Sequence, residues 1–225
     1  MRRFDSARLT TGVLVLMLLS TGIGCRAAYY HSMEMIGRDK RQLLANGVAA
    51  VRDSQQEAAR QFESALEQFT AFTGYRGGEL EAMYERLDDA FQESEDRAAS
   101  VRRQIENVER VSEDLFAEWE RELDLYNDQR LRAASEQKLA DTRLLYADLL
   151  ETMHRTERRM QPVLDTFRDQ VLFLKHNLNA QAVASLEGNS ETLRRDVDLL
   201  IEQMETSIAA AERFIRHIEA ADAGA

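Results

Sequence analysis

A glutamate and a histidine three residues apart form the spacing in this sequence that most suggests a metal site. Glu151-Thr-Met-His154 is an E-x-x-H pattern, which on one helix face supplies two ligands to the di-iron sites of some helical bundles. Such a site also needs a second E-x-x-H, and no second one occurs in the chain. Three arginines follow at Arg155, Arg158 and Arg159 and disfavour a bound cation. We therefore interpret His154 as a surface or boundary residue and predict no metal and no cofactor.

Patterns for other chemistry are missing from the sequence. There is no P-loop, no G-x-G-x-x-G and no G-x-S-x-G. An acid-rich stretch between Asp88 and Asp96 lacks the glycine turn and alternating spacing of a calcium loop, so it reads as a solvated helix face. We predict no catalytic residue and no enzymatic activity.

The single cysteine, Cys25, stands where a lipid anchor would be attached. Three arginines in the first eight residues precede the apolar run Leu9–Leu19, which is shorter than the roughly 20 residues that a membrane span needs. Small residues then lead to the cysteine, an order typical of an export signal. A signal that ends on Cys resembles the lipobox of bacterial lipoproteins. This resemblance implies removal of residues 1–24 and lipidation of Cys25, the alternatives being a plain signal peptide with a chance cysteine or an uncleaved anchor.

The resemblance also implies a location. Arg26, and not an aspartate, follows the cysteine, which in a Gram-negative host implies export to the periplasmic face of the outer membrane. Removing residues 1–24 takes away three Arg and one Asp and moves the net charge from −11 to −13. So acidic a chain is not expected to bind nucleic acid, nor to adhere to anionic lipid by charge. The membrane is therefore expected as a partner through Cys25 alone.

Glycine and proline are scarce, and this determines the fold class. The 225 residues include ten Gly and one Pro, and no Gly occurs between Glu79 and Glu187. Turn-rich β-sandwiches and barrels need such residues about every ten positions. With 44% hydrophobic residues the chain is also too apolar for a disordered class. Long helices remain.

Four stretches carry core residues at alternating spacings of three and four, the pattern of coiled-coil-like packing with a left-handed supercoil. The first runs from Leu44 to Phe72 with Gln55 as its one polar member, and the second from Leu80 to Tyr126. The third runs from Leu139 to Leu178 and is interrupted by Pro162, where we expect a kink. The fourth stretch consists of Leu193, Val197, Leu200, Met204, Ile208, Ala211, Ile215 and Ile218.

We predict an all-α fold: an elongated antiparallel four-helix bundle with coiled-coil-like packing, preceded by a lipoprotein signal peptide. Short connections between long helices favour antiparallel neighbours. A tether over 25–32 and a tail over 222–225 would flank a single bundle over 33–221. The expected helices span about 33–73, 79–126, 129–177 and 180–221. The break before the last helix is expected at 177–179, with 188–190 as the alternative; the other turns are expected at 74–78 and 127–128.

The turns at 74–78 and 177–179 would lie together at one end of the bundle, the tip, far from the anchor. Exposed aromatic rings beside polar donors are common at partner-binding sites. The same residue types also close the end of a core and cap helices, and that interpretation stays open. The candidate tip residues are Phe72, Tyr75, Phe173, Lys175, His176, Asn177 and Asn179.

Several segments of the mature chain resemble a bacterial lipoprotein family catalogued as domain of unknown function 2959. They are 28–30, 54–58, 64–69 and 167–172 and, most specific of all, Leu174-Lys175-His176-Asn177-Leu178-Asn179-Ala180. The resemblance covers essentially the whole mature chain. It implies a lipid-anchored helical protein and carries over no activity.

Two classes of function are compatible with these features. The first is a lipid-anchored envelope protein with a structural or interaction role, as a scaffold or adaptor for an envelope protein partner. The second is a bundle that holds a small apolar ligand or a metal in its core, which would require a cavity near Ser94, Ser112 or Pro162. The oligomeric state does not follow, because a heptad pattern serves intramolecular and intermolecular bundles equally.

Overall fold

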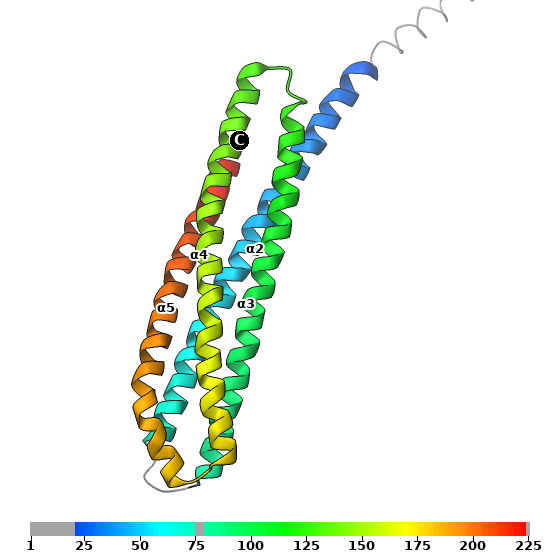
Figure 1. Ribbon diagram of the computed structural model, residues 1–225. Coiled ribbons are helices and arrows are strands. Elements are labelled where there is room, and N and C mark those ends of the chain that lie inside the picture. The colour runs from blue at the N-terminus through cyan, green and yellow to red at the C-terminus, as the bar shows by residue number, and fades with distance from the viewer. Residues whose placement is uncertain (1–20, 75–78, 224–225) are drawn as a thin grey trace, which may run out of the picture. The chain divides into compact units, whose positions relative to one another are not determined.

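The computed structural model describes residues 21–74 and 79–223, and for 21–39, 221–223, Glu187 and Asn189 it describes the backbone alone. The described residues form helices without any strand: α2 (Thr21–Thr73), α3 (Leu80–Leu123), α4 (Gln129–His176) and α5 (Ala180–Ala223) (Figure 1). The predicted all-α bundle is confirmed. The chain divides into two units, Met1–Arg41 and Gln42–Ala225. The packing described below belongs to the second unit.

Helix boundaries differ from the prediction mainly at the start of α2 and at the end of α3, whereas α4 begins at Gln129 as predicted. The structure begins α2 at Thr21, so the residues of the expected tether, 25–32, are helical. Alanines at 27 and 28 favour helix there. Helix α3 ends at Leu123, three residues before the expected end, and leaves Tyr126 outside the helix and 39% exposed.

The break between α4 and α5 lies at 177–179, and α5 continues through Gly188. The Asn179 side-chain oxygen accepts a hydrogen bond from the Ala182 backbone N–H at 3.0 Å, which satisfies a donor that the first turn of a helix leaves free. Asp128 caps α4 in the same way, accepting from the N–H groups of Arg130 and Leu131 at 2.8 and 3.4 Å. Helix α4 runs without a break through Pro162.

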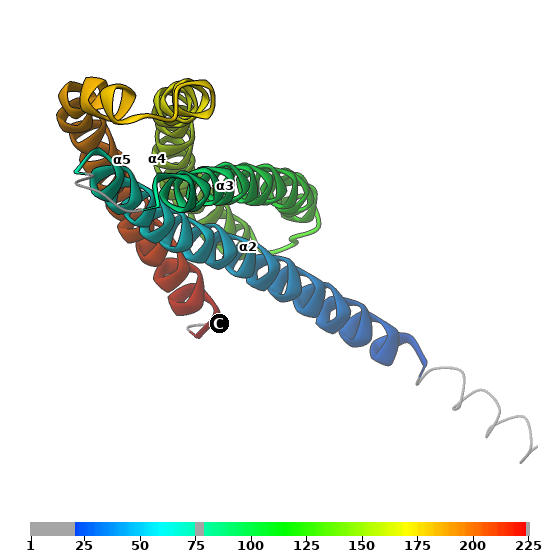
Figure 2. The same ribbon diagram turned by 90° about the horizontal axis from the view of Figure 1, so that it is seen from below.

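Within the second unit, α2 lies beside α3 and α5, and α4 lies beside α3 and α5 (Figures 1 and 2). Neighbouring helices are antiparallel. Along α3 and α4, for example, Arg143 meets Glu120 near one end and Arg168 meets Glu95 toward the other, so the numbering rises on one helix as it falls on its neighbour. None of the described helices has the apolar length that crossing a membrane requires.

The core runs continuously between the four helices from Leu44 to Ile218. Every position of the first predicted stretch is buried, including Gln55. Phenylalanines fill the half of the core nearer the α4–α5 turn, where the rings of Phe69 and Phe167 meet edge to face at 6.1 Å between centroids.

On α5 the prediction was partly wrong. Ser207 and Phe214 are buried, whereas Ile208 and Ile215, which were expected in the core, are half-buried. Steps of three and four from Met204 permit either choice, because 3.6 residues per turn lies between them. The Phe214 ring packs against Tyr146 at 6.0 Å between centroids, and Ser207, two turns earlier on the same helix face, is buried as well. Ile208 instead lies between α5 and α2.

Candidate functional site

His154 joins α3 to α4 through two carboxylates. Its Nε2 lies 2.9 Å from Glu109 on α3, and its Nδ1 lies 3.0 Å from Glu157 one turn along α4. Burial by itself lowers the pKa of His154, but the hydrogen bonds and charges of Glu157 and Glu109 together outweigh it and raise that pKa above its ordinary value. Arg102 also pairs with Glu157 at 3.1 Å. The cluster is an interhelical clasp at the boundary of the core, which agrees with the interpretation of His154 as a boundary residue.

The E-x-x-H spacing does not bring its two residues together. Glu151 is exposed and pairs with Arg155 at 2.5 Å, while His154 turns to Glu109 and Glu157. Over the part of the chain that the structure describes, no group of three or more His, Cys, Asp or Glu side chains is arranged to hold a metal ion.

The candidate tip residues divide into structural and exposed ones. Phe72 is fully buried and closes the end of the core. Asn179 caps α5, and the Asn177 amide donates to the Phe173 carbonyl at 3.0 Å as α4 ends. Phe173 is 41% exposed, and Lys175 and His176 are exposed beside it. Tyr75 lies outside the described residues, as does the side chain of Cys25.

A polar layer crosses the middle of the core. Gln55 is fully buried, and neither its amide nitrogen nor its amide oxygen has a hydrogen-bond partner within the protein. On α5 the Ser207 hydroxyl and the Gln203 side-chain oxygen are buried and unpartnered in the same way. The Thr156 hydroxyl donates across to the Gln203 carbonyl at 3.2 Å. The sequence prediction singled out Gln55 as the polar member of the first stretch but missed its counterparts on α5.

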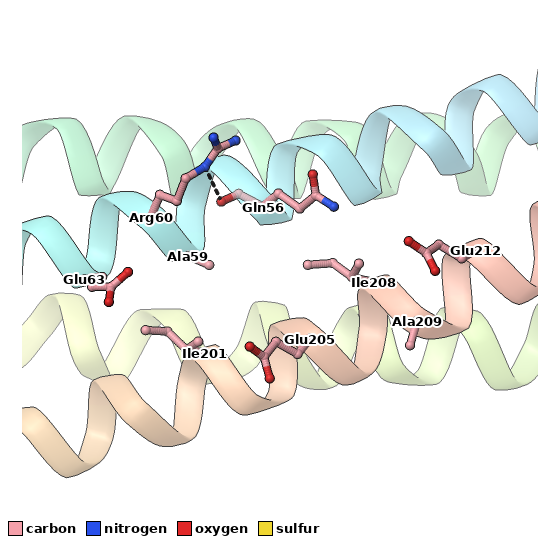
Figure 3. A pocket seen from close by; sticks show the side chains of 9 residues that line it. All are labelled: Gln56, Ala59, Arg60, Glu63, Ile201, Glu205, Ile208, Ala209 and Glu212. Atoms are coloured by element: carbon pink, nitrogen blue, oxygen red, sulfur yellow. Dashed lines mark hydrogen bonds between the residues drawn. The ribbon is translucent and has the colours of Figure 1, made fainter.

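A long groove separates α2 from α5 on the surface at this level. Its larger part has a volume of about 540 Å³ and lies between Gln56 and Glu63 on α2 and between Ile201 and Glu212 on α5. Figure 3 shows Ala59, Ile201 and Ile208 lying between the two helices. A second part of about 440 Å³ shares Glu63 and Ile201 with the first and continues to Thr70 and Ala71. The two parts form one channel with an apolar floor.

The walls of the groove are predominantly acidic. Two acids on α2, Glu63 and Glu67, face three on α5, which are Asp198, Glu205 and Glu212. The bases that line the groove are Arg60 and Arg194. The Arg60 guanidinium bonds to the Gln56 carbonyl of its own helix at 3.3 Å, so it does not bridge the groove (Figure 3). Among the described residues, no ion pair engages Glu63, Glu67 or Glu205.

The chain matches the model of the family described as "Protein of unknown function (DUF2959)" over residues 29–218. The chain belongs to this family. Comparison with curated proteins and with solved structures gives no match. The DUF2959 region includes the groove, the polar layer, the histidine clasp and the tip, so all four are features of the domain itself. The sequence prediction missed the groove, although α5 carries its signal: Ile201, Ile208 and Ile215 recur every seven residues beside the core positions.

Proposed function

We propose that this DUF2959 protein is a lipid-anchored envelope protein, not an enzyme, whose four-helix antiparallel bundle serves a structural or interaction role. The filled core carries this proposal. At two levels where a core-binding protein would need a cavity, the Ser94 and Ser112 hydroxyls donate to the Ala90 and Glu109 carbonyls of their own helix, at 2.8 and 2.7 Å. Fully buried aromatic and aliphatic side chains occupy the space between the helices.

The hollows among the described residues also favour surface recognition. The α2–α5 groove is a surface channel, and a smaller hollow of about 270 Å³ beside Ser112 is open, with Glu109, Glu113 and Arg143 on its rim. Elongated grooves between helices are a common way for helical proteins to recognise other proteins. The filled core and the open surface together favour the scaffold or adaptor role over the binding of a ligand within the bundle.

The anchor part of the proposal rests on Cys25 and the export signal before it. Several acyl chains on one cysteine give stable attachment, because each buried CH₂ contributes about 0.8 kcal/mol. In a Gram-negative host, Arg26 directs the protein to the periplasmic face of the outer membrane. The tip turn between α4 and α5 lies at the end of the bundle opposite the α3–α4 turn (Figure 1).

Three experiments test this function. Cys25→Ala is expected to abolish labelling by radioactive palmitate, and persistent label would contradict the lipid anchor. Crosslinking in living cells followed by mass spectrometry is expected to identify an envelope protein joined to the bundle. If the protein crosslinks to nothing, and deletion of its gene changes neither envelope composition nor envelope integrity, the interaction role is wrong. The tip is tested in the same cells with Tyr75→Ala and Lys175→Glu. Unchanged crosslinking partners and an unchanged phenotype would contradict a docking role for the tip.

A further inference from the structure

We propose that the α2–α5 groove is a docking site for a basic amphipathic helix of a partner protein. This inference rests on the proposed interaction function and assigns it a surface and a partner chemistry. The groove has what a docked helix needs, an apolar floor between two polar walls. The features below identify the length, the face and the charge of that helix.

The seam between α2 and α5 differs from the other seams of the bundle because no polar contact closes it. Helix α2 is joined to α3 by Gln61, whose amide donates to the Ala90 carbonyl at 2.9 Å, and by the Glu57–Arg97 ion pair at 2.6 Å. Between residues 42–73 of α2 and 191–220 of α5, the structure shows no hydrogen bond and no ion pair. Over these residues α2 and α5 therefore meet without a polar contact, and the groove beside them stays open.

The apolar floor continues the core outward. Ile201, Ile208 and Ile215 are half-buried and pack on the core, with one side chain every two turns of α5. Seven-residue spacing is the period with which one helix contacts another in coiled-coil packing. The three isoleucines thus form a second apolar stripe on α5, beside the stripe that packs in the core. Ala59 on α2 leaves space opposite them (Figure 3).

The core behind this level adds an independent observation. Gln55 and Ser207 directly precede the groove residues Gln56 and Ile208, and both are fully buried with unpartnered polar atoms. Unpartnered buried polar groups destabilise the packing around them. The unpartnered Gln55 amide and Ser207 hydroxyl therefore weaken the packing directly behind the groove, at the level where a partner would contact it.

The length of the groove determines the length of the partner segment. The lining residues span 56–71 on α2 and 194–212 on α5, or about 24 and 28 Å at 1.5 Å per residue. A helix of roughly 16–19 residues, four to five turns, fills that length. The charge of the groove determines the sign of the partner: with five acids against two bases on the walls, Lys and Arg on both flanks of the docked helix find partners.

A second copy of this chain does not fit that chemistry. The chain carries a formal net charge of −11, and α5 itself presents Asp198, Glu205 and Glu212 at seven-residue intervals. Placing such a helix against the acidic walls opposes like charges, which is unfavourable across an interface. The groove thus selects a basic helix from a different protein.

The test uses the full chain in nanodiscs of neutral phosphatidylcholine and a synthetic peptide of roughly 18 residues. The peptide carries Leu and Ala on one helical face, Lys on both flanks and a photocrosslinking group, and a matched peptide has Glu in place of every Lys. Crosslinked residues are mapped by mass spectrometry. The basic peptide is expected to label residues 56–71 and 194–212 and to do so less as salt increases. The acidic peptide is expected to leave them unlabelled.

Three variants make the test specific. The pair Glu63→Lys and Glu205→Lys is expected to reduce labelling about tenfold or more. Ala209→Trp changes no charge, fills the groove from an exposed position and is expected to reduce labelling similarly. A control pair on α4, Glu136→Lys and Asp148→Lys, makes the same change in net charge at exposed, unpaired positions and is expected to leave labelling unchanged.

The proposal is overturned if the groove variants label like the unaltered chain, if both peptides label equally, or if the label falls elsewhere. Concentration-dependent dimerisation that Ala209→Trp abolishes would identify a second copy as the occupant and would also overturn it. These failures are distinguishable from failure of the proposed function, because crosslinks in cells to an envelope protein through the tip would uphold that function without the groove.

Discussion

Replacing Gln55 with methionine is expected to stabilise the protein. Gln55 is fully buried and both polar atoms of its amide lack partners. Placing an amide in the interior without hydrogen bonds costs about 1–3 kcal/mol by mutational measurement. Methionine has nearly the same length, shape and helix propensity, and its flexible thioether adapts to the space that the amide leaves.

The expected gain in the free energy of unfolding is therefore about 1–3 kcal/mol. For a chain of this size that gain raises the melting temperature by between about 2 and 12 °C. Urea unfolding followed by circular dichroism at 222 nm measures the free energy directly. The midpoint should rise while the slope with urea stays constant, because the surface exposed on unfolding hardly changes.

Gln61→Met is the matched control on the same helix. The Gln61 amide donates to the Ala90 carbonyl, so the substitution removes a hydrogen bond and is expected to cost about 0.5–1.5 kcal/mol. The carbonyl itself still accepts from the Ser94 hydroxyl. If Gln55→Met instead destabilises the protein by more than about 1 kcal/mol, the Gln55 amide is hydrogen-bonded in solution and the argument from unpartnered groups is wrong. Equal gains from both substitutions would refute it as well.

Three further predictions are tested by the same unfolding measurement. Gly188→Ala is expected to stabilise α5 by about 1 kcal/mol, since an added Cβ meets no atom within 4 Å, whereas Gly47→Ala should gain less because its Cβ would lie 3.1 Å from Val108. Asn179→Ala is expected to cost about 1 kcal/mol through loss of the α5 N-cap. The raised pKa of His154 stabilises the fold fully below its unfolded pKa of about 6.5, and this contribution is lost as pH rises through the folded pKa. His154→Gln should therefore destabilise the protein more at pH 5.5 than at pH 8.5.

Each of these predictions has a contrary result. Equal effects of the two glycine substitutions would show that the Val108 side chain leaves room for a Cβ at position 47. An unchanged midpoint for Asn179→Ala would show that the Asn179 cap does not stabilise the start of α5. A pH-independent cost of His154→Gln would mean that the clasp does not depend on the protonated ring.

Every position that the sequence predicted in the first core stretch is buried, because these residues follow one regular path from Leu44 to Phe72, although Ala45, Leu66 and Thr73 are buried beside them. On α5 the sequence prediction placed Ile208 and Ile215 in the core in place of Ser207 and Phe214, because both sets fit steps of three and four. The contact between Phe214 and Tyr146 decides, and it depends on the pairing of α5 with α4.

The candidate sites show the same division between local and long-range information. The neighbourhood of His154 predicts a surface or boundary residue, but its partner Glu109 lies 45 residues away on another helix. Local chemistry leaves the asparagines around the α4–α5 break as either partner contacts or helix caps, and the structure shows Asn179 capping α5 and Asn177 bonded to the end of α4. The groove requires that α2 and α5 be neighbours; the isoleucine repeat on α5 indicates an extra apolar stripe but not which helix faces it.

That adjacency of the first and last helices has a consequence for biosynthesis. A chain made from its N-terminus completes α2, α3 and α4 well before α5 exists. Until then the inward faces of α2 and α4, with Phe69 and Phe167, lack the helix that encloses them, and the newly made chain exposes them to any chaperone or aggregation partner nearby. A chain that ends near His176 would keep that exposure permanently. Premature termination late in translation is therefore expected to yield an insoluble product, although three of the four helices of the bundle are present.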